Sequence, residues 1–193
     1  MLASGHATDL YTNASDVLDD LRQDDALGTR LAAQGPLSLA DPAIPSDTVG
    51  HALGEAIGAR LYDEVAHRRT FESLSERQLD WVLGANPWGS SFVVGAGARY
   101  PRCLAHQIAN LSGSLTGRGV LDLGAVVAGP TGRSGEAGAP DGYRRCAVDS
   151  RLYASFDGSG MHYRDDVGSP VTSEPSDDLA GMSLLAFAQA ALG

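Results

Sequence analysis

The sequence contains no lysine, so arginine is its only strongly basic side chain. Its 14 basic residues are outnumbered by 24 acidic ones, which gives a formal net charge of −10 and a pI near 4.7. Proteins that bind polyanions draw their affinity from clustered basic side chains, so this balance argues against nucleic acid as a partner. A neutral ligand, such as an uncharged polysaccharide, meets no such penalty.

Long apolar runs are also missing. No stretch of about 18 consecutive apolar residues occurs, so we expect no membrane-spanning helix. A secretory signal peptide has a basic start and an apolar stretch, and both are absent from the N-terminal sequence MLASGHATDLYTNASD. Two interpretations remain open: the protein is cytoplasmic, or its true start lies upstream of Met1.

Cysteine is scarce. Cys103 and Cys146 are too few for a disulfide scaffold, and their spacing fits neither a CxxC redox motif nor a zinc site. They are either two buried thiols or one loop-closing disulfide, and a secreted parent protein would favour the disulfide. No cluster of potential ligands is diagnostic of a metal, so the sequence assigns no metal site and no cofactor and leaves calcium binding open.

The chain is nevertheless long and apolar enough to fold. Its 193 residues are 43% hydrophobic and 20% charged, which is typical of one globular domain with a single core. Apolar residues recur at helical spacing in three N-terminal segments and indicate amphipathic helices there. These residues are Leu10, Ala14, Val17, Leu18 and Leu21; then Leu53, Ile57, Leu61 and Val65; then Phe71, Leu74, Leu79, Val82 and Leu83.

Breaks between these segments predict where the helices begin and end. Residues 35–45 are rich in Pro, Ser and Ala and indicate a loop, after which Ser46-Asp47-Thr48 can cap the second helix. Thr70 can cap the third helix, which Gly84 and Pro87 close. The second and third helices should form an αα-hairpin.

The C-terminal segment 179–192 is apolar almost all round. Such a pattern predicts a buried helix rather than a surface one. A buried last helix needs other helices around it, so we expect an all-α fold that belongs to a larger helical assembly.

Between residues 84 and 170 the pattern changes to a glycine-rich one. Residues 92–94 and 125–127 are the only β-like runs, and the remainder is expected to be ordered loop. Long loops without regular structure are uncommon unless they carry function.

An acidic stretch, YRDDVGSPVTSE, occupies residues 163–174 and brings together Asp165, Asp166 and Glu174. Neighbouring carboxylates have their pKa values pushed apart, and one acid with one ionised carboxylate is the pairing that glycosidic-bond cleavage requires. The alternative is that these residues only cap the following helix and oppose its dipole.

Three motifs in a fixed order strengthen the first interpretation. The first is LGANPWGSSFVVGAG at 83–97, followed by Tyr100-Pro101 and His106; the second is GAVVAGPTG at 124–132, followed by PDGY at 140–143. The third comprises Tyr163, Asp165 and Glu174. From about Ser46 to its end the chain resembles glycoside hydrolase family 9, the cellulases and endo-β-1,4-glucanases, and its His-Gln pair resembles an actinobacterial subgroup.

This resemblance implies a fold and an activity. The fold would be an (α/α)₆ toroid, of which residues 1–193 supply the last helical hairpins and long loops as the C-terminal portion of the catalytic domain. The activity would be hydrolysis of β-1,4-glucosidic bonds in cellulose or related β-glucans with inversion, by a secreted parent enzyme. Glu174 takes the position of the general acid, and Asp165 matches the aspartate that orders the site.

The resemblance also implies substrate contacts. His106 and Gln107 lie in the substrate loop, and Trp88 and Tyr100 are candidates for stacking on glucose rings. Without the motifs, a lone Trp is more often a core residue and a lone His a structural one. The chain departs from the family pattern in having Ala105-His106-Gln107 for His-His-Arg, Pro170 for an aromatic, and Ala180 for an Asn.

One half of the implied mechanism is missing. An inverting glycosidase needs a second carboxylate about 6.5–9.5 Å from the acid to activate water. The family's Asp-Ala-Gly-Asp motif, which supplies it, is absent from this sequence. We therefore expect the isolated chain to have little or no activity and, without its partner helices, to associate or be poorly soluble. The alternatives are a non-catalytic carbohydrate-binding remnant and a helical interaction domain.

Overall fold

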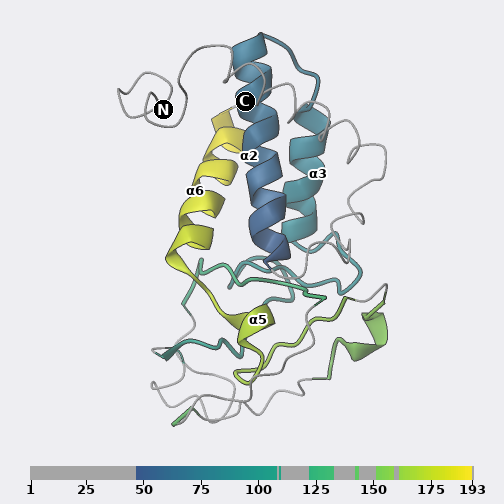
Figure 1. The fold of residues 1–193 in the computed structure, drawn as a ribbon, viewed down its shortest axis with the longest axis vertical. Coiled ribbons are helices and arrows are strands. Elements are labelled where there is room, and N and C mark those ends of the chain that lie inside the picture. Colours follow the sequence, from purple (N-terminus) through teal and green to yellow (C-terminus); the bar gives the residue numbers. More distant parts are fainter. Residues whose placement is uncertain are drawn as a thin grey trace.

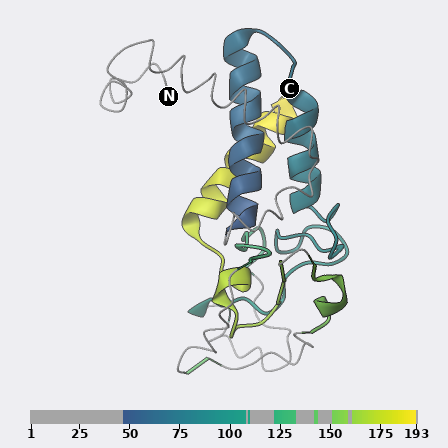
Figure 2. The same cartoon turned by 45° about the vertical axis from the view of Figure 1, so that its right-hand side comes forward.

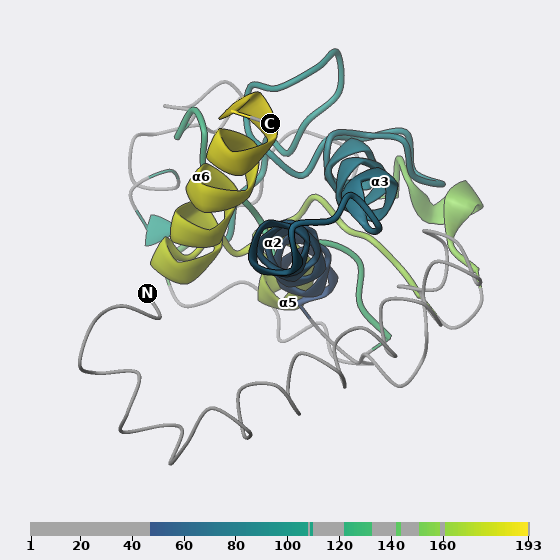
Figure 3. The same ribbon diagram turned by 90° about the horizontal axis from the view of Figure 1, so that it is seen from above.

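The computed structural model describes residues 47–107, 109, 122–132, 142–143, 151–158 and 161–192. Within them the helices are α2 (Thr48–Ala66), α3 (Glu72–Val82), the 3-10 turn η3 (Ala154–Phe156), α5 (Pro170–Ser173) and α6 (Asp177–Leu192). The three long helices stand side by side above a layer of loops that contains α5, and α2 lies between α3 and α6 (Figures 1 to 3). The helix predicted at 10–21 and the loop predicted at 35–45 lie outside the described residues.

The αα-hairpin of α2 and α3 is confirmed, but its caps differ from the prediction. The N-cap of α3 is Phe71, not Thr70. The Asp63 carboxylate instead accepts the backbone N–H groups of Thr70 (2.9 Å) and Phe71 (2.8 Å), and so holds the turn between the helices. Helix α2 begins at Thr48, within the predicted capping stretch, and its N-cap residue is Asp47. The Asp47 side chain accepts no capping hydrogen bond.

Helix α2 buries only the first half of the predicted face, since Leu53 is fully buried and Ile57 packs against the core. Its core-facing residues are mostly small, whereas Leu61 is 44% exposed and Val65 is 49% exposed. The reason is close packing: a Cβ at Gly50 would lie 3.2 Å from Leu179 Cδ2, so α6 approaches the glycine side of α2. The inward position predicted for Leu83 is also wrong, because α3 ends at Val82 and Leu83 is 42% exposed.

Helix α6 forms where predicted but is not buried. Only Leu179, Ser183 and Ala186 are buried, while Leu184 is 74% exposed and Leu192 is 89% exposed. A helix with apolar residues on every side is expected to be covered on every side, but α2 covers only one side of α6. The outer face of α6 is therefore an apolar surface without a covering helix among the described residues.

The loop layer is held by short β contacts rather than by extended strands in the part of the chain that is described. The two β-like runs meet at the antiparallel bridge between Val93 and Val126. Val94 N–H donates to the Ala125 carbonyl (2.8 Å), and Val127 N–H donates to the Phe92 carbonyl (3.1 Å). This pairing joins the first motif to the glycine-rich second motif.

Tyr163 lies at the centre of the aromatic core. Its substitution can compare the contribution of the buried ring to stability with that of the hydroxyl. Its side chain is fully buried, its ring centroid is 5.1 Å from those of Phe92 and Tyr153, and its hydroxyl has no partner among the described residues. An unpaired buried hydroxyl is costly, so we expect Tyr163→Phe to leave the free energy of unfolding unchanged or to raise it by about 1 kcal/mol. Tyr163→Ala should lower it by about 3–5 kcal/mol, because it opens a cavity. Urea unfolding of both variants tests this, and a large loss for Tyr163→Phe would contradict it.

Candidate active site

The three sequence motifs meet at the short helix α5. Ala105 N–H, from the loop that follows the first motif, donates to the Ser173 carbonyl at 3.1 Å. In the second motif, Gly129 N–H donates to the Thr172 carbonyl (3.2 Å) and Ala128 N–H to the Glu174 carbonyl (3.0 Å). Backbone hydrogen bonds therefore bring the His106 loop and the glycine-rich loop to the residues that precede Glu174.

Glu174 is the exposed carboxylate at this junction. It is the C-cap residue of α5, and its own N–H donates to the Pro170 carbonyl (3.0 Å). The next residue, Pro175, forms an antiparallel bridge with Val127. The side chain is exposed and makes no hydrogen bond or ion pair within the described part of the chain. A carboxyl group on a fixed backbone, free of internal partners, is available to a ligand.

Asp165 is a different kind of carboxylate. It is 3% exposed, and its Oδ1 accepts the backbone N–H groups of Arg102 (3.0 Å) and Cys103 (2.8 Å). Desolvation by burial raises the pKa of Asp165 to about 6, against the opposing effect of these two hydrogen bonds. The carboxylate thus faces the backbone that leads to His106 rather than solvent.

Two substitutions of Asp165 separate the effect of its charge on stability from the effect of its hydrogen bonds. Asp165→Ala leaves two buried N–H groups unpaired and should cost about 2–5 kcal/mol of stability. Asp165→Asn keeps the Oδ1 acceptor for both groups and should cost less. Because the folded-state pKa is raised, protonated Asp165 favours the folded state, and this contribution is lost as pH rises from 4 through 6.

The wild-type free energy of unfolding should therefore fall relative to that of Asp165→Asn, by on the order of 3 kcal/mol between pH 4 and pH 7. Urea titrations at several pH values measure the difference. A constant difference between the two proteins across this range would contradict the burial argument.

The predicted substrate-contact residues on the first loop lie close to solvent. The Tyr100 ring is half-buried, and the Arg102 guanidinium lies 4.7 Å from its centroid, over one face. His106 Nδ1 is 3.4 Å from Asp122 Oδ2, and Gln107 is exposed. Tyr100, His106 and Gln107 are therefore accessible, and their contact with a substrate stays a prediction.

Trp88 does not share this exposure. It is 3% exposed, and its indole N–H donates to Asp157 Oδ1 at 3.0 Å. An indole without an exposed face offers no platform to a sugar ring, so the stacking role predicted for Trp88 finds no support in its position. The burial matches the alternative, a core tryptophan.

The Asn86 side chain holds the turn that follows α3 in the first motif. Its side-chain amide donates to the carbonyls of Trp81 (2.7 Å) and Ser90 (2.8 Å), and its Oδ1 accepts Trp88 N–H at 3.1 Å. One side chain thus satisfies three backbone groups where α3 gives way to the loop.

Cys103 is 1% exposed and is not a free thiol. Cys146, its predicted partner, lies outside the described residues. The pairing of Cys103 with Cys146 stays a prediction, which mass analysis with and without reduction tests.

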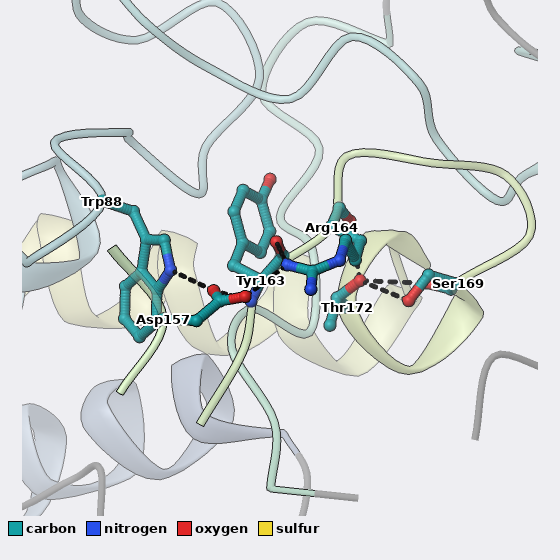
Figure 4. A network of polar contacts seen from close by, with 6 residues as sticks. All are labelled: Trp88, Asp157, Tyr163, Arg164, Ser169 and Thr172. Carbon is teal, nitrogen blue, oxygen red and sulfur yellow. Dashed lines mark hydrogen bonds and ion pairs between the residues drawn. The ribbon is translucent and has the colours of Figure 1, made fainter. Parts of the chain in front are cut away.

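Sequence reasoning missed the residues that connect the motifs. Asp157 accepts hydrogen bonds from Trp88 and Tyr163 and pairs with Arg164, whose carbonyl accepts the Thr172 hydroxyl at 2.7 Å (Figure 4). None of the quoted motifs includes Asp157, and its partner Trp88 is 69 positions away. No local pattern could have identified this contact.

Other features of the described residues lie away from this junction. A pocket of about 430 Å³ lies near the C-terminal ends of α2 and α6, at the end of the helices opposite the loop layer, with Arg60 and Gln189 in its lining. No group of three or more His, Cys, Asp and Glu side chains in the described part could hold a metal ion. None of the described helices is both long and apolar enough to cross a membrane.

Comparisons with known proteins agree with this arrangement. The chain is 34% identical over 115 residues to Endoglucanase 1 of Oryza sativa subsp. japonica, which is 49% of this chain and 18% of that protein. It is 43% identical over 58 residues to Endoglucanase 7 of the same organism, 30% of this chain and 9% of the relative. The chain thus spans less than a fifth of the length of these relatives.

Two solved structures share its fold. A metagenome-derived glycoside hydrolase family 9 endoglucanase aligns with a TM-score of 0.56 and 25% identity, over 74% of this chain and 22% of that one. The cellulase Cel9M of C. cellulolyticium, solved in complex with cellobiose, aligns with a TM-score of 0.50 and 19% identity, over 77% and 30% of the two chains. These likenesses confirm the all-α class and agree with a partial (α/α)₆ toroid.

The family assignment rests on the longest match. The model of Glycosyl hydrolase family 9 matches residues 6–186, which is most of the chain and includes all three motifs. The chain belongs to glycosyl hydrolase family 9.

Proposed function

We propose that this chain is the C-terminal portion of a family 9 catalytic domain that hydrolyses β-1,4-glucosidic bonds in cellulose or a related β-glucan with inversion. The observation that carries the proposal is the convergence of three motif segments on α5, next to an exposed Glu174 without an internal partner. Family membership and the endoglucanase relatives support the same substrate class.

In the proposed mechanism Glu174 is the general acid. Its carboxyl group gives a proton to the glycosidic oxygen as the bond to the leaving sugar breaks, while water attacks the opposite face of the ring. Asp165 cannot activate that water from its present position, because it is buried and accepts two backbone N–H groups. In this proposal the base lies in the family's Asp-Ala-Gly-Asp motif, which would be supplied by another part of the catalytic domain.

Substrate positioning falls to the first loop in this proposal. The hydroxyl groups of a glucose unit would be bound by His106 and Gln107, and its C–H face would lie on the ring of Tyr100. Arg102 covers one face of that ring, so a sugar would use the other face. The hydrogen bonds that the Asp165 carboxylate accepts from the N–H groups of residues 102 and 103 fix the backbone that carries these groups.

The missing portion of the domain would also explain the exposed apolar residues. Leu184 and Leu192 on α6, with Leu61 and Val65 on α2, would pack against preceding helices of the toroid. We expect the isolated chain to self-associate at micromolar concentration and Leu184→Glu with Leu192→Glu to reduce this association. Sedimentation velocity of both proteins measures it, and a monodisperse wild-type monomer would contradict this explanation.

A secreted parent enzyme is part of the proposal. The absence of a free thiol among the described residues supports it, because disulfides persist in oxidising compartments.

The second candidate is a carbohydrate-binding remnant without catalysis. The convergence of the motif loops on α5 supports sugar binding in this candidate too, since binding requires no second carboxylate. The coding sequence upstream of Met1 separates the two candidates: an in-frame family 9 segment that carries the Asp-Ala-Gly-Asp motif supports the hydrolase, and a ribosome-binding site followed by a genuine start codon supports the remnant.

A further inference from the structure

Asp157 lies where three segments of the loop layer meet, and each of its carboxylate oxygens has a separate task. Oδ1 accepts the Trp88 indole N–H (3.0 Å) and the Tyr163 backbone N–H (3.1 Å). Oδ2 accepts the Arg164 guanidinium at 2.6 Å (Figure 4). With three donors bound, this carboxylate holds its neighbours in place and is not free to act on a ligand.

The pair formed by Asp157 and Arg164 is largely shielded from water. Their side chains are 18% and 20% exposed. A shielded ion pair with a short charge-assisted hydrogen bond is rigid. The Arg164 guanidinium is held further by the Tyr163 carbonyl, to which it donates at 2.9 Å. The pair is therefore suited to fixing a position rather than to adding net stability.

What the pair fixes is the segment that carries both motif carboxylates. Arg164 immediately precedes Asp165, and its carbonyl accepts the Thr172 hydroxyl, which also lies 2.8 Å from the Ser169 hydroxyl. Thr172 belongs to α5, which ends at Glu174. A continuous polar path thus runs from the first motif at Trp88, through Asp157 and Arg164, to the helix that presents Glu174.

We infer that Asp157 is a positioning residue, which acts through Arg164 to set where the Glu174 carboxylate stands relative to the His106 loop. This inference rests on the proposed function, because it assigns Asp157 a role in that site. A positioning role differs from a packing role in its consequence. Loss of the ion pair between Asp157 and Arg164 should alter the surroundings of Glu174 while the core stays folded.

The variants separate the tasks of the two oxygens. Asp157→Asn keeps a carbonyl oxygen for Trp88 and Tyr163 and turns an amide group toward Arg164, so only the ion pair is lost. Arg164→Gln removes the cation, and the double variant leaves no charge unpaired. Arg164→Lys is the conservative variant, and Asp80→Asn, on the exposed side of α3, is the matched control.

The experiment uses the full chain labelled with ¹³C at its glutamate carboxyl groups. The Glu174 signal is identified by its absence in Glu174→Gln, and each protein is titrated first with acid and then with cellotetraose. Circular dichroism and thermal unfolding record whether each variant is folded.

We expect Asp157→Asn and Arg164→Gln to displace the Glu174 signal and to weaken cellotetraose binding about tenfold. The double variant and Arg164→Lys should recover part of both effects, and Asp80→Asn should match the wild type. If either single variant unfolds, the Glu174 signal and the cellotetraose affinity of Arg164→Lys and of the double variant are compared with those of the wild type instead.

Folded variants whose Glu174 signal and cellotetraose affinity equal those of the wild type would overturn the inference. A wild-type chain that shows no response to cellotetraose would count instead against the substrate contacts proposed for Tyr100, His106 and Gln107. In that case the displacement of the Glu174 signal in the ligand-free proteins still decides whether Asp157 positions this carboxylate.

Discussion

Gly129→Ala should lower the free energy of unfolding by about 2–4 kcal/mol, because the substitution combines a steric clash with backbone strain. Gly129 has φ of +82°, and a Cβ there would lie 2.4 Å from Val49 Cγ2 and 3.3 Å from Thr48 Oγ1. Val49 is fully buried at the start of α2 and cannot move aside easily. The glycine-rich loop approaches α2 this closely because Val49 N–H donates to the Ala128 carbonyl at 3.2 Å.

The matched control is Gly124→Ala, in the same motif. Gly124 has φ of +87°, but a Cβ there would meet nothing within 4 Å. Only the backbone strain applies, so we expect a loss of about 1–2 kcal/mol. Urea unfolding gives both values. Equal losses for the two alanine variants would show that the contact with Val49 does not constrain the loop.

Glu174→Gln should lower the rate of β-glucan hydrolysis by the complete catalytic domain about 10²- to 10⁴-fold. Glutamine keeps the shape of the side chain but cannot give a proton to the leaving oxygen. Because the Glu174 carboxylate has no internal partner among the described residues, the substitution should leave stability nearly unchanged. The measurement is kcat on a soluble β-glucan, with Tm as the folding control.

Glu76→Gln on the exposed side of α3 is the matched control, and it should leave kcat unchanged. A Glu174→Gln enzyme that retains wild-type kcat would remove Glu174 from the role of acid. A loss of activity accompanied by an equal loss for Glu76→Gln would point to a general effect on the protein.

Helix positions and the buried face of α3, apart from Leu83, could be predicted from the sequence, whereas the buried face of α2 could be predicted only in part. The spacing of Leu53, Ile57, Leu61 and Val65 placed α2 correctly, but the structure turns the alanine and glycine side of that helix toward its neighbours. A pattern of large apolar residues does not register close approach, which small residues permit. The positions of the two β-like runs were also predicted. Their pairing was not, because it joins residues that are far apart in the sequence.

The burial predicted for α6 failed for a different reason. Its sequence is apolar on every side, and the pattern predicts an apolar environment without saying which chain segment provides it. Leu184 and Leu192 are exposed because the described helices cover one side only. Under the proposed function, preceding helices of the toroid would supply the apolar environment that α6 lacks.

The candidate site could also be predicted only in part from the sequence. Motif order predicted that Glu174, Asp165 and the His106 loop belong together. The His106 loop meets α5 through a backbone hydrogen bond, and the Asp165 carboxylate binds the backbone of the same loop. Motif order could not separate an exposed carboxylate from a buried one, nor identify Asp157. Burial and long-range pairing are properties of the folded chain, so only the structure reveals them.

The central claim is that Glu174 is one half of an acid–base pair whose other half lies outside these residues. The direct measurement is reducing-sugar release from a soluble β-glucan by the chain alone and by the chain joined to its upstream coding sequence. We predict no release by the chain alone, release by the extended protein, and loss of that release in its Glu174→Gln variant. Release by the chain alone that Glu174→Gln does not reduce would contradict the account.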